Sequence, residues 1–318
     1  MPYRWLLPVL VLACLASAVA ITAMTFAPDN SALNWHIFWN LHAPLILTAV
    51  LVGAVLCVSA GSLQVVLRNP LADPGIIGIT SGASLVAATL LLVPGVAGRL
   101  PVYYLLPLGC FTGALVSTFA IYRIAARLRG ATTAVILAGI AISTLSGAII
   151  AWLYLFSDAQ SLRNLTFWLM GNLYQADWTI LFVSAPFMLA SIAVQLRQAG
   201  KLNWLYGGDV TATSAGVNPQ RLTMTVLVAA AIGVGAAVAV AGAIAFLGLL
   251  VPHLLRLWLG FDNRLILPAS ALTGALVLLL VVLITEVSAS ITLPVSMLTA
   301  TLGGPLLLVT LYRGQWRL

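Results

Sequence analysis

The chain has 318 residues, of which 62% are hydrophobic and only 7% are charged. Soluble globular proteins carry about 25% charged residues, so this composition excludes a water-soluble fold. The net charge of +7 does not indicate nucleic acid as a partner, because no basic cluster alternates with exposed polar residues as a phosphate-binding face requires. We therefore expect the chain to lie in a lipid bilayer.

Ten apolar runs are long enough to cross a bilayer, which takes about 17 to 25 residues in a helix. Backbone N–H and C=O groups find no water in lipid, and no run alternates polar with apolar residues as a barrel strand does, so each run must be a helix. The expected fold class is all-α, a polytopic membrane protein forming a single domain, 1–318. The expected spans are 6–26, 44–67, 76–93, 103–122, 134–156, 178–196, 222–241, 243–259, 265–287 and 294–312.

Positive charge is distributed unevenly between the two ends of these helices. Arg99 and Arg163 lie at one end, whereas the other twelve of the 14 Lys and Arg residues lie at the opposite end. Basic residues accumulate on the cytoplasmic side of membrane proteins, so an even number of crossings places both termini in the cytoplasm. We expect a multi-pass protein of the bacterial inner membrane, with segments outside at 27–43, 94–102, 157–177, about 242 and 288–293.

The second apolar run ends in the sequence RNPLADPGIIG, which starts at Arg68. A residue that precedes proline disfavours the helical conformation, so Asn69 before Pro70 and Asp73 before Pro74 must end the helix. Two interpretations fit. The stretch is either an ordinary tight cytoplasmic turn or a shaped element that holds one form against a partner, and its density of Pro, Asn and Asp favours the second.

The longest polar interval on the expected cytoplasmic side is KLNWLYGGDVTATSAGVNPQR, with a coupling segment at about 201–220. Asp209 can cap a short helix that runs through Thr213, Gly216 is placed as the residue after its end, and Pro219 starts the next helix. A helix of two turns is not stable alone in water. It must therefore pack either on its own chain or on a soluble partner beneath the membrane.

An intramembrane lipid-modifying enzyme and a passive channel are the alternative functions. Such an enzyme needs a nucleophile with a base, paired carboxylates or metal ligands at membrane depth. The embedded ionisable residues are only His253, Arg256 and Glu286, and no second ligand lies one turn from His253, so no metal site is expected. A channel should show a ring or stripe of polar residues, and none is visible. The only lysine, Lys201, is not part of a phosphate-binding G-x-x-x-x-G-K-[ST] loop, so the chain is not an ATPase.

Several stretches resemble the permease subunits of the FecCD type, which belong to ABC importers for ferric siderophores, haem and cobalamin. The matching stretches are GAVLCVSAGSLQVVLRNPLADPGIIGITSGA at 53–83, LAGIAIS at 137–143, WLMGNLYQADW at 168–178, GGDVTATSAGVN at 207–218, GAIAFLGLLVPHLLR at 242–256, DNRLILPASALTGA at 262–275 and LPVSMLTATLGGP at 293–305. The resemblance implies a ten-helix subunit that pairs with a like permease subunit and lines half of the translocation path. It also implies two cytoplasmic ATPase subunits, which bind ATP and Mg, a periplasmic substrate-binding protein, and no cofactor in this chain. Ferric siderophore is the expected cargo because it is the family's commonest; whether the dimer is homo- or heteromeric is open.

The resemblance also assigns roles to residues. Contact with the ATPase is expected from Gly208, Asp209, Thr213, Gly216, Val217 and Asn218. A cytoplasmic gate or loop is expected from Arg68, Asn69, Pro70, Asp73 and Pro74. Candidates to line the path are Ser81, Ser84, Ser143 and Ser146, although these stretches could equally serve close helix packing.

Among the motifs of the family that are altered here, two concern docking of the binding protein. The family usually carries R-x-P-R at the outer start of the second helix, where this chain has His42 and Leu45 in place of the arginines. The arginine of a D-x-x-x-R motif in the ninth helix aligns with Glu286. Those arginines dock acidic residues of the binding protein. His42, Leu45 and Glu286 are therefore candidates for an altered docking face, which would meet a neutral or basic lobe or leave docking to a sister subunit. The alternative for Glu286 is that its side chain simply extends to water at the periplasmic surface.

Overall fold

The computed structural model describes residues 5–24, 31–75, 77–93, 102–127, 132–288 and 293–312. These ranges contain helices joined by short connections and no β-strand. The helices are α1 (Leu6–Ala23), α2 (Ser31–Ile37), the π-helix η1 (Phe38–His42), α3 (Ala43–Val66), α4 (Ile79–Leu92), α5 (Val102–Arg127), α6 (Thr132–Leu155), α7 (Ala159–Leu169), the 3₁₀-helix η2 (Leu173–Gln175), α8 (Trp178–Tyr206), α9 (Asp209–Ser214), α10 (Pro219–Ala241), α11 (Leu247–Leu259), α12 (Asn263–Ser288) and α13 (Val295–Tyr312).

The membrane-spanning helices fall on the spans expected from the sequence. Within the described ranges, seven helical stretches are long and apolar enough to cross a membrane, and three shorter apolar helices accompany them. Together these are α1, α3, α4, α5, α6, α8, α10, α11, α12 and α13. The all-α membrane fold is therefore confirmed.

Two segments that were expected to lie outside the spans are partly helical. The segment before α3 holds α2 and η1, which continue into α3 so that Asn34–Val66 is one helical stretch. The interval between α6 and α8 holds α7, whose first turn is capped by the Asp158 carboxylate, which accepts hydrogen bonds from the backbone N–H groups of Gln160 and Ser161. One face of α7 buries Leu165 and Trp168, which explains why so short a helix is stable here.

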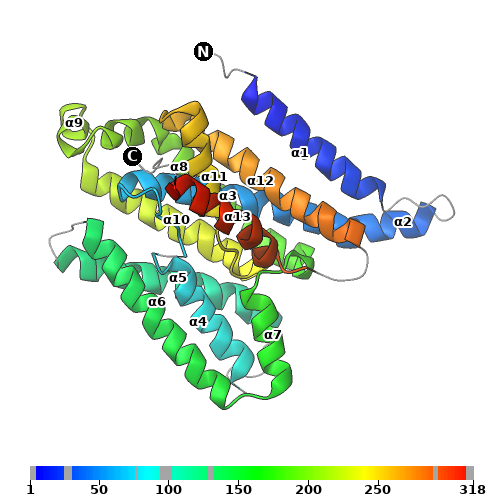
Figure 1. Cartoon of the computed structure of the whole chain (residues 1–318). Helices are drawn as coiled ribbons and strands as arrows, with labels where there is room; N and C mark the ends of the chain where they lie inside the picture. The colour runs from blue at the N-terminus through cyan, green and yellow to red at the C-terminus, as the bar shows by residue number, and fades with distance from the viewer. Residues whose placement is uncertain are drawn as a thin grey trace.

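The helices run between two distinguishable ends of the bundle (Figure 1). The α9 end is the one where α9 lies, and the α7 end is the one where α2 and α7 lie. Helix α1 begins, and α13 ends, towards the α9 end. The two described ends of the chain therefore lie on the same side of the bundle.

The centre of the bundle is made by α3 and α10, whose residues are mostly buried. Small residues let the helices touch. The backbone of Gly274 in α12 fills the place that a Cβ on Gly53 of α3 would need, and Gly82 of α4 meets Gly113 of α5 in the same way. Without a hydrophobic driving force between helices in lipid, such close packing is what holds membrane helices together.

Helices α4 and α11 are short because each begins inside the bundle. Before α4, the carbonyl of Gly78 accepts a hydrogen bond from Ser117 of α5, and a Cβ on Gly139 of α6 would meet the backbone of Ile77. Before α11, residues 242–246 are not helical. The spans expected at 76–93 and 243–259 therefore start later, at Ile79 and Leu247, because these starting segments are extended or turned and bond to neighbouring helices.

Candidate coupling and transport site

The short helix α9 ends as the sequence predicts. Gly216 has a φ of +76°, and its N–H donates to the carbonyl of Thr213, while the N–H of Val217 donates to the carbonyl of Ala212. This pair of bonds is the Schellman arrangement, which needs a left-handed residue and so favours glycine. The next helix begins at Pro219, and the side chain of Asn218 caps it by accepting from the N–H of Arg221.

The predicted capping role of Asp209 is wrong. The N-cap is Gly208, which has a φ of +104° and no side chain to offer, and Asp209 is the first helical residue. Its carboxylate instead accepts a hydrogen bond from the guanidinium of Arg68 at 2.5 Å, across 141 residues of sequence. The coupling segment and the RNPLADP segment, predicted as separate features, therefore touch through this ion pair.

The packing of α9 was left open between its own chain and a soluble partner. Ala212 is fully buried against the chain, whereas Val210 is 82% exposed on the same helix. Helix α9 therefore packs on its own chain on the side of Ala212 and exposes Val210 on the other side. The coupling segment was expected at about 201–220. In the structure it is shorter and covers 207–218, since α8 runs to Tyr206 and α10 begins at Pro219.

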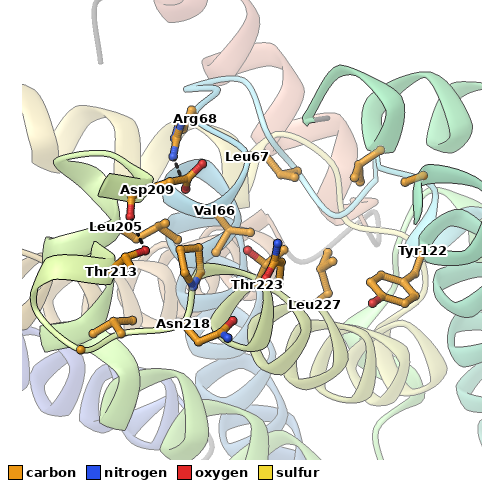
Figure 2. A pocket seen from close by; sticks show the side chains of 16 residues that line it. Val66, Leu67, Arg68, Tyr122, Leu205, Asp209, Thr213, Asn218, Thr223 and Leu227 are labelled. Carbon is orange, nitrogen blue, oxygen red and sulfur yellow. Dashed lines mark hydrogen bonds and ion pairs between the residues drawn. The ribbon is translucent and has the colours of Figure 1, made fainter. Parts of the chain in front are cut away.

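A cavity of about 1060 Å³ lies beside this ion pair at the α9 end. Figure 2 shows Arg68 and Asp209 on one side of it and Tyr122 of α5 on the other. Its lining comes from the end of α3, from α5, α6 and α8, and from the stretch from Asp209 to Leu227. Movement of α9 would therefore change a space that five membrane helices share, α3, α5, α6, α8 and α10.

The segment 68–78 is shaped by its own polar side chains. The Asn69 side chain accepts from the N–H of Leu71, and the Asp73 carboxylate accepts from the N–H of Gly75. Arg68 has a φ of +45°, which is unusual for a residue with a side chain. Ala72 and Ile77 are buried. The segment is thus more than a tight turn, and its exposed residues among those described are Arg68 and Leu71.

The start of α4 faces the start of α11. Asp73, Gly75 and Thr80 line a cavity of about 210 Å³ together with residues 243–246 and Leu249. An Asp73 carboxylate oxygen lies where a Cβ on Gly248 would be in close contact. The carboxylate is therefore near the first turn of α11, where the helix dipole favours negative charge.

The four predicted pathway serines divide into two pairs. Ser81 of α4 donates to Ser143 of α6 at 2.8 Å, and both are half-buried. Ser84 and Ser146 are buried, with 7% and 4% exposure. The second pair is thus less accessible than the first, and the pathway role of all four serines stays a prediction.

The predicted docking residues do not form one surface. Leu45 is 3% exposed and belongs to the core, so its assignment to a docking face is wrong; the sequence offered no sign that α3 turns this position inward. His42 is half-buried at the end of η1. Burial and then the charge and hydrogen bond of Glu286 raise the pKa of Tyr174. Glu286 therefore bonds a tyrosine of its own chain and does not simply extend to water.

Comparison with known proteins decides the family. The sequence model of the FecCD transport family matches residues 5–313, nearly the whole chain. The chain belongs to the FecCD transport family. The resemblance inferred from the sequence is thereby confirmed. A FecCD protein is a permease subunit of an ABC importer, so this chain is a transport subunit that leaves ATP hydrolysis to ATPase subunits and, as a class, works with a substrate-binding protein.

Similar FecCD proteins include permeases with named cargo. The hemin transport system permease protein HmuU of Yersinia pestis is 40% identical over 285 residues, which cover 89% of this chain and 85% of the relative. The vitamin B12 import system permease protein BtuC of Vibrio cholerae is 39% identical over 289 residues, which cover 90% and 85%. A solved structure described as an inward-facing conformation of a metal-chelate type ABC transporter has a TM-score of 0.88, 28% identity, and coverage of 98% of this chain and 100% of that one.

Two residues that shape the interior of this FecCD chain were missed. Ser296 donates to the carbonyl of Ala243 and accepts from the N–H of Ala245, and Thr299 donates to the carbonyl of Ala245. These bonds hold the non-helical residues before α11. A hydroxyl that hydrogen-bonds backbone groups more than fifty residues away gives no pattern in the sequence. The sequence showed only that the apolar run is interrupted near residue 242.

Proposed function

We propose that this chain is the permease of an importer for a metal chelate in the class of haem, cobalamin and ferric siderophores, with its α9 end in the cytoplasm. The observation that carries the proposal is the similarity over nearly the whole chain to a hemin permease and a vitamin B12 permease. A ferric siderophore, which is the cargo expected from the sequence, belongs to this class. The named relatives, however, transport hemin and vitamin B12 and so support haem and cobalamin more directly.

The geometry of α9 supports a coupling role. The helix exposes Val210 and is joined to the start of the RNPLADP segment by the Arg68–Asp209 ion pair. We propose that an ATPase subunit binds the exposed side of α9. A shift of α9 would then pull on segment 68–78, which leads into α4, and the Ser81–Ser143 hydrogen bond would carry the shift to α6. Each nucleotide state would stabilise one arrangement by its own set of contacts.

Co-purification tests the ATPase contact. In Val210→Asp, we expect the ATPase subunits to be lost from the purified complex, because a carboxylate would enter an apolar contact. Val287→Asp changes another exposed valine, which is 65% exposed at the α7 end, and should leave the complex intact. Equal recovery of ATPase with both variants would contradict the role of α9.

Cysteine accessibility tests the orientation. A cysteine at Thr211 should be protected from a membrane-impermeant reagent in intact cells, and one at Gln160 should react, since both positions are exposed and they lie at opposite ends of the helix bundle (Figure 1). The reverse pattern would overturn the orientation.

Uptake into proteoliposomes that hold the complete importer tests the cargo. We expect ATP-dependent accumulation of one of haemin, cobalamin or a ferric hydroxamate siderophore, with at least tenfold preference over the other two. Accumulation of none of the three would contradict the proposed cargo class.

A further inference from the structure

A third cavity lies between α5 and α10, next to the large cavity of the coupling site. It measures about 240 Å³ and is lined by Leu115, Thr118, Phe119, Tyr122, Met224, Leu227, Val228 and Ala231. The hydroxyl of Thr118 bonds to the carbonyl of Ala114 in its own helix, so it leaves the cavity surface essentially apolar. An apolar space of this kind suits a hydrocarbon chain and not a polar solute.

Two of the residues that line the cavity are exposed on the outer surface of the bundle. Phe119 is 58% exposed and Val228 is 38% exposed. In a chain that spans the bilayer, apolar side chains of this size on the outside of membrane helices meet lipid wherever no second subunit covers them. The cavity is therefore reachable by a lipid acyl chain from the side.

Three arginines of α5 and α10 lie between the residues that line the cavity and the α9 end of these helices. The Arg123 guanidinium carbon lies 5.5 Å from the centre of the Phe119 ring, which lines the cavity. Arg127 follows one turn further along α5, and Arg221 precedes Met224 by one turn on α10. Residues three or four apart on a helix share a face. All three arginines are exposed, and neither α5 nor α10 contains an acidic residue.

We propose that this groove binds an anionic glycerophospholipid, with an acyl chain in the α5–α10 cavity and the phosphate headgroup at Arg123, Arg127 and Arg221. Basic residues at the edge of a slot between membrane helices favour anionic headgroups by charge, and guanidinium groups bind phosphate with two parallel hydrogen bonds. Tyr122 and Leu227 line both this cavity and the large cavity beside α9. The bound lipid would therefore contact the wall of the coupling site.

Native mass spectrometry of the purified complex in neutral detergent tests the proposal. Dioleoyl-phosphatidylglycerol and dioleoyl-phosphatidylcholine are titrated separately, since they share acyl chains and differ in headgroup charge. We expect the permease to retain the anionic lipid at least tenfold more strongly. Arg123→Gln with Arg221→Gln should abolish this preference, and Arg123→Lys with Arg221→Lys should keep most of it.

A second pair of variants tests the cavity. Val228→Phe fills the slot and should reduce retention of the anionic lipid at least fivefold. Val116→Phe makes the same change at an exposed position of α5 outside the cavity, and Arg197→Gln removes an exposed arginine from α8; both should behave as the parent. Equal retention of the two lipids by the parent overturns the proposal. Undiminished retention in folded Val228→Phe, checked by its melting temperature, overturns the assignment of the acyl chain to this slot.

Discussion

Two helix breaks meet inside the bundle, and different parts of the chain hold them. In the break at 68–78, Asn69 and Asp73 bond backbone N–H groups two residues further on. In the break at 242–246, Ser296 and Thr299 of α13 supply the bonds from more than fifty residues away. The first break therefore has local side-chain bonds in its middle, and Arg68 at its start and Gly78 at its end bond to other parts of the chain. The second break has no such local side-chain bonds among the described residues and depends on where α13 lies. A cargo or partner that shifts α13 would change the second break and leave the first intact.

The largest effect should come from Gly242, at the start of the second break. Gly242 has a φ of +70°, and the carbonyl oxygen of Trp168 occupies the place of a Cβ. Left-handed backbone and steric overlap together should cost Gly242→Ala about 3 kcal/mol or more of unfolding free energy. Gly147→Ala, where a Cβ would meet nothing within 4 Å, is the control. Thermal unfolding in detergent measures both, and equal midpoints would show that the break tolerates a side chain.

The next effect concerns the distant bonds of the second break. Ser296→Ala combined with Thr299→Val removes the partners of three backbone groups at Ala243 and Ala245. We expect a loss of about 1 to 3 kcal/mol and faster hydrogen exchange at 242–247. Thr301→Val removes a hydroxyl that bonds only Met297 of its own helix and should change neither. Faster exchange at 68–78 as well would mean that the two breaks are not independent.

A smaller effect should follow from Asn69 in the first break. Asn69→Ala removes one side-chain bond to the N–H of Leu71 in a partly exposed segment. Because water can replace this partner, we expect a loss below about 1 kcal/mol, with faster exchange confined to the N–H groups near Leu71. The matched variant Asn164→Ala, on the exposed side of α7, should leave this segment unchanged. Unfolding as severe as that of Gly242→Ala would refute the local character of the break.

The smallest effect on stability should come from the ion pair that joins the first break to α9. The side chains of Arg68 and Asp209 are 48% and 64% exposed, and exposed pairs contribute about 0 to 1 kcal/mol. Arg68→Gln should therefore keep the melting temperature but lower substrate-stimulated ATP hydrolysis severalfold. The exchanged pair, Arg68→Asp with Asp209→Arg, should recover part of the loss. Normal stimulation in Arg68→Gln would exclude a coupling role for the pair.

The sequence was sufficient for the membrane-spanning helices and for one of the two breaks, but not for the helices α2, η1 and α7 outside the spans. Apolar length predicts the spans, and proline with asparagine and aspartate predicts the break after α3, because both signals are local. Gly216 is equally legible, since a left-handed helix end favours glycine. The predicted cap at Asp209 failed because glycine can serve as an N-cap and the carboxylate found a distant arginine.

The rest depends on contacts between distant residues. The hydroxyls of Ser296 and Thr299 have the same chemistry as those that bond within their own helix, so their role appears only when α13 lies beside residues 243–245. Leu45 resembles a surface position by alignment, but the rotation of α3 buries it. Glu286 found Tyr174, more than a hundred residues earlier in the chain. Sequence patterns do not contain such rotations and pairings.

The glycine contacts described above limit how this protein can change shape. At Gly53–Gly274 and at Gly82–Gly113 the two backbones are in contact. Sliding of one helix along the other would therefore bring a backbone carbonyl into steric overlap with the opposite backbone. Helices α3 and α12 must therefore move together as one rigid unit, and α4 and α5 must move as another. A conformational change that opens and closes a path must therefore move these two rigid units relative to each other. Helix α10 packs against α3, α4 and α5, so its contacts with both units must change during that movement.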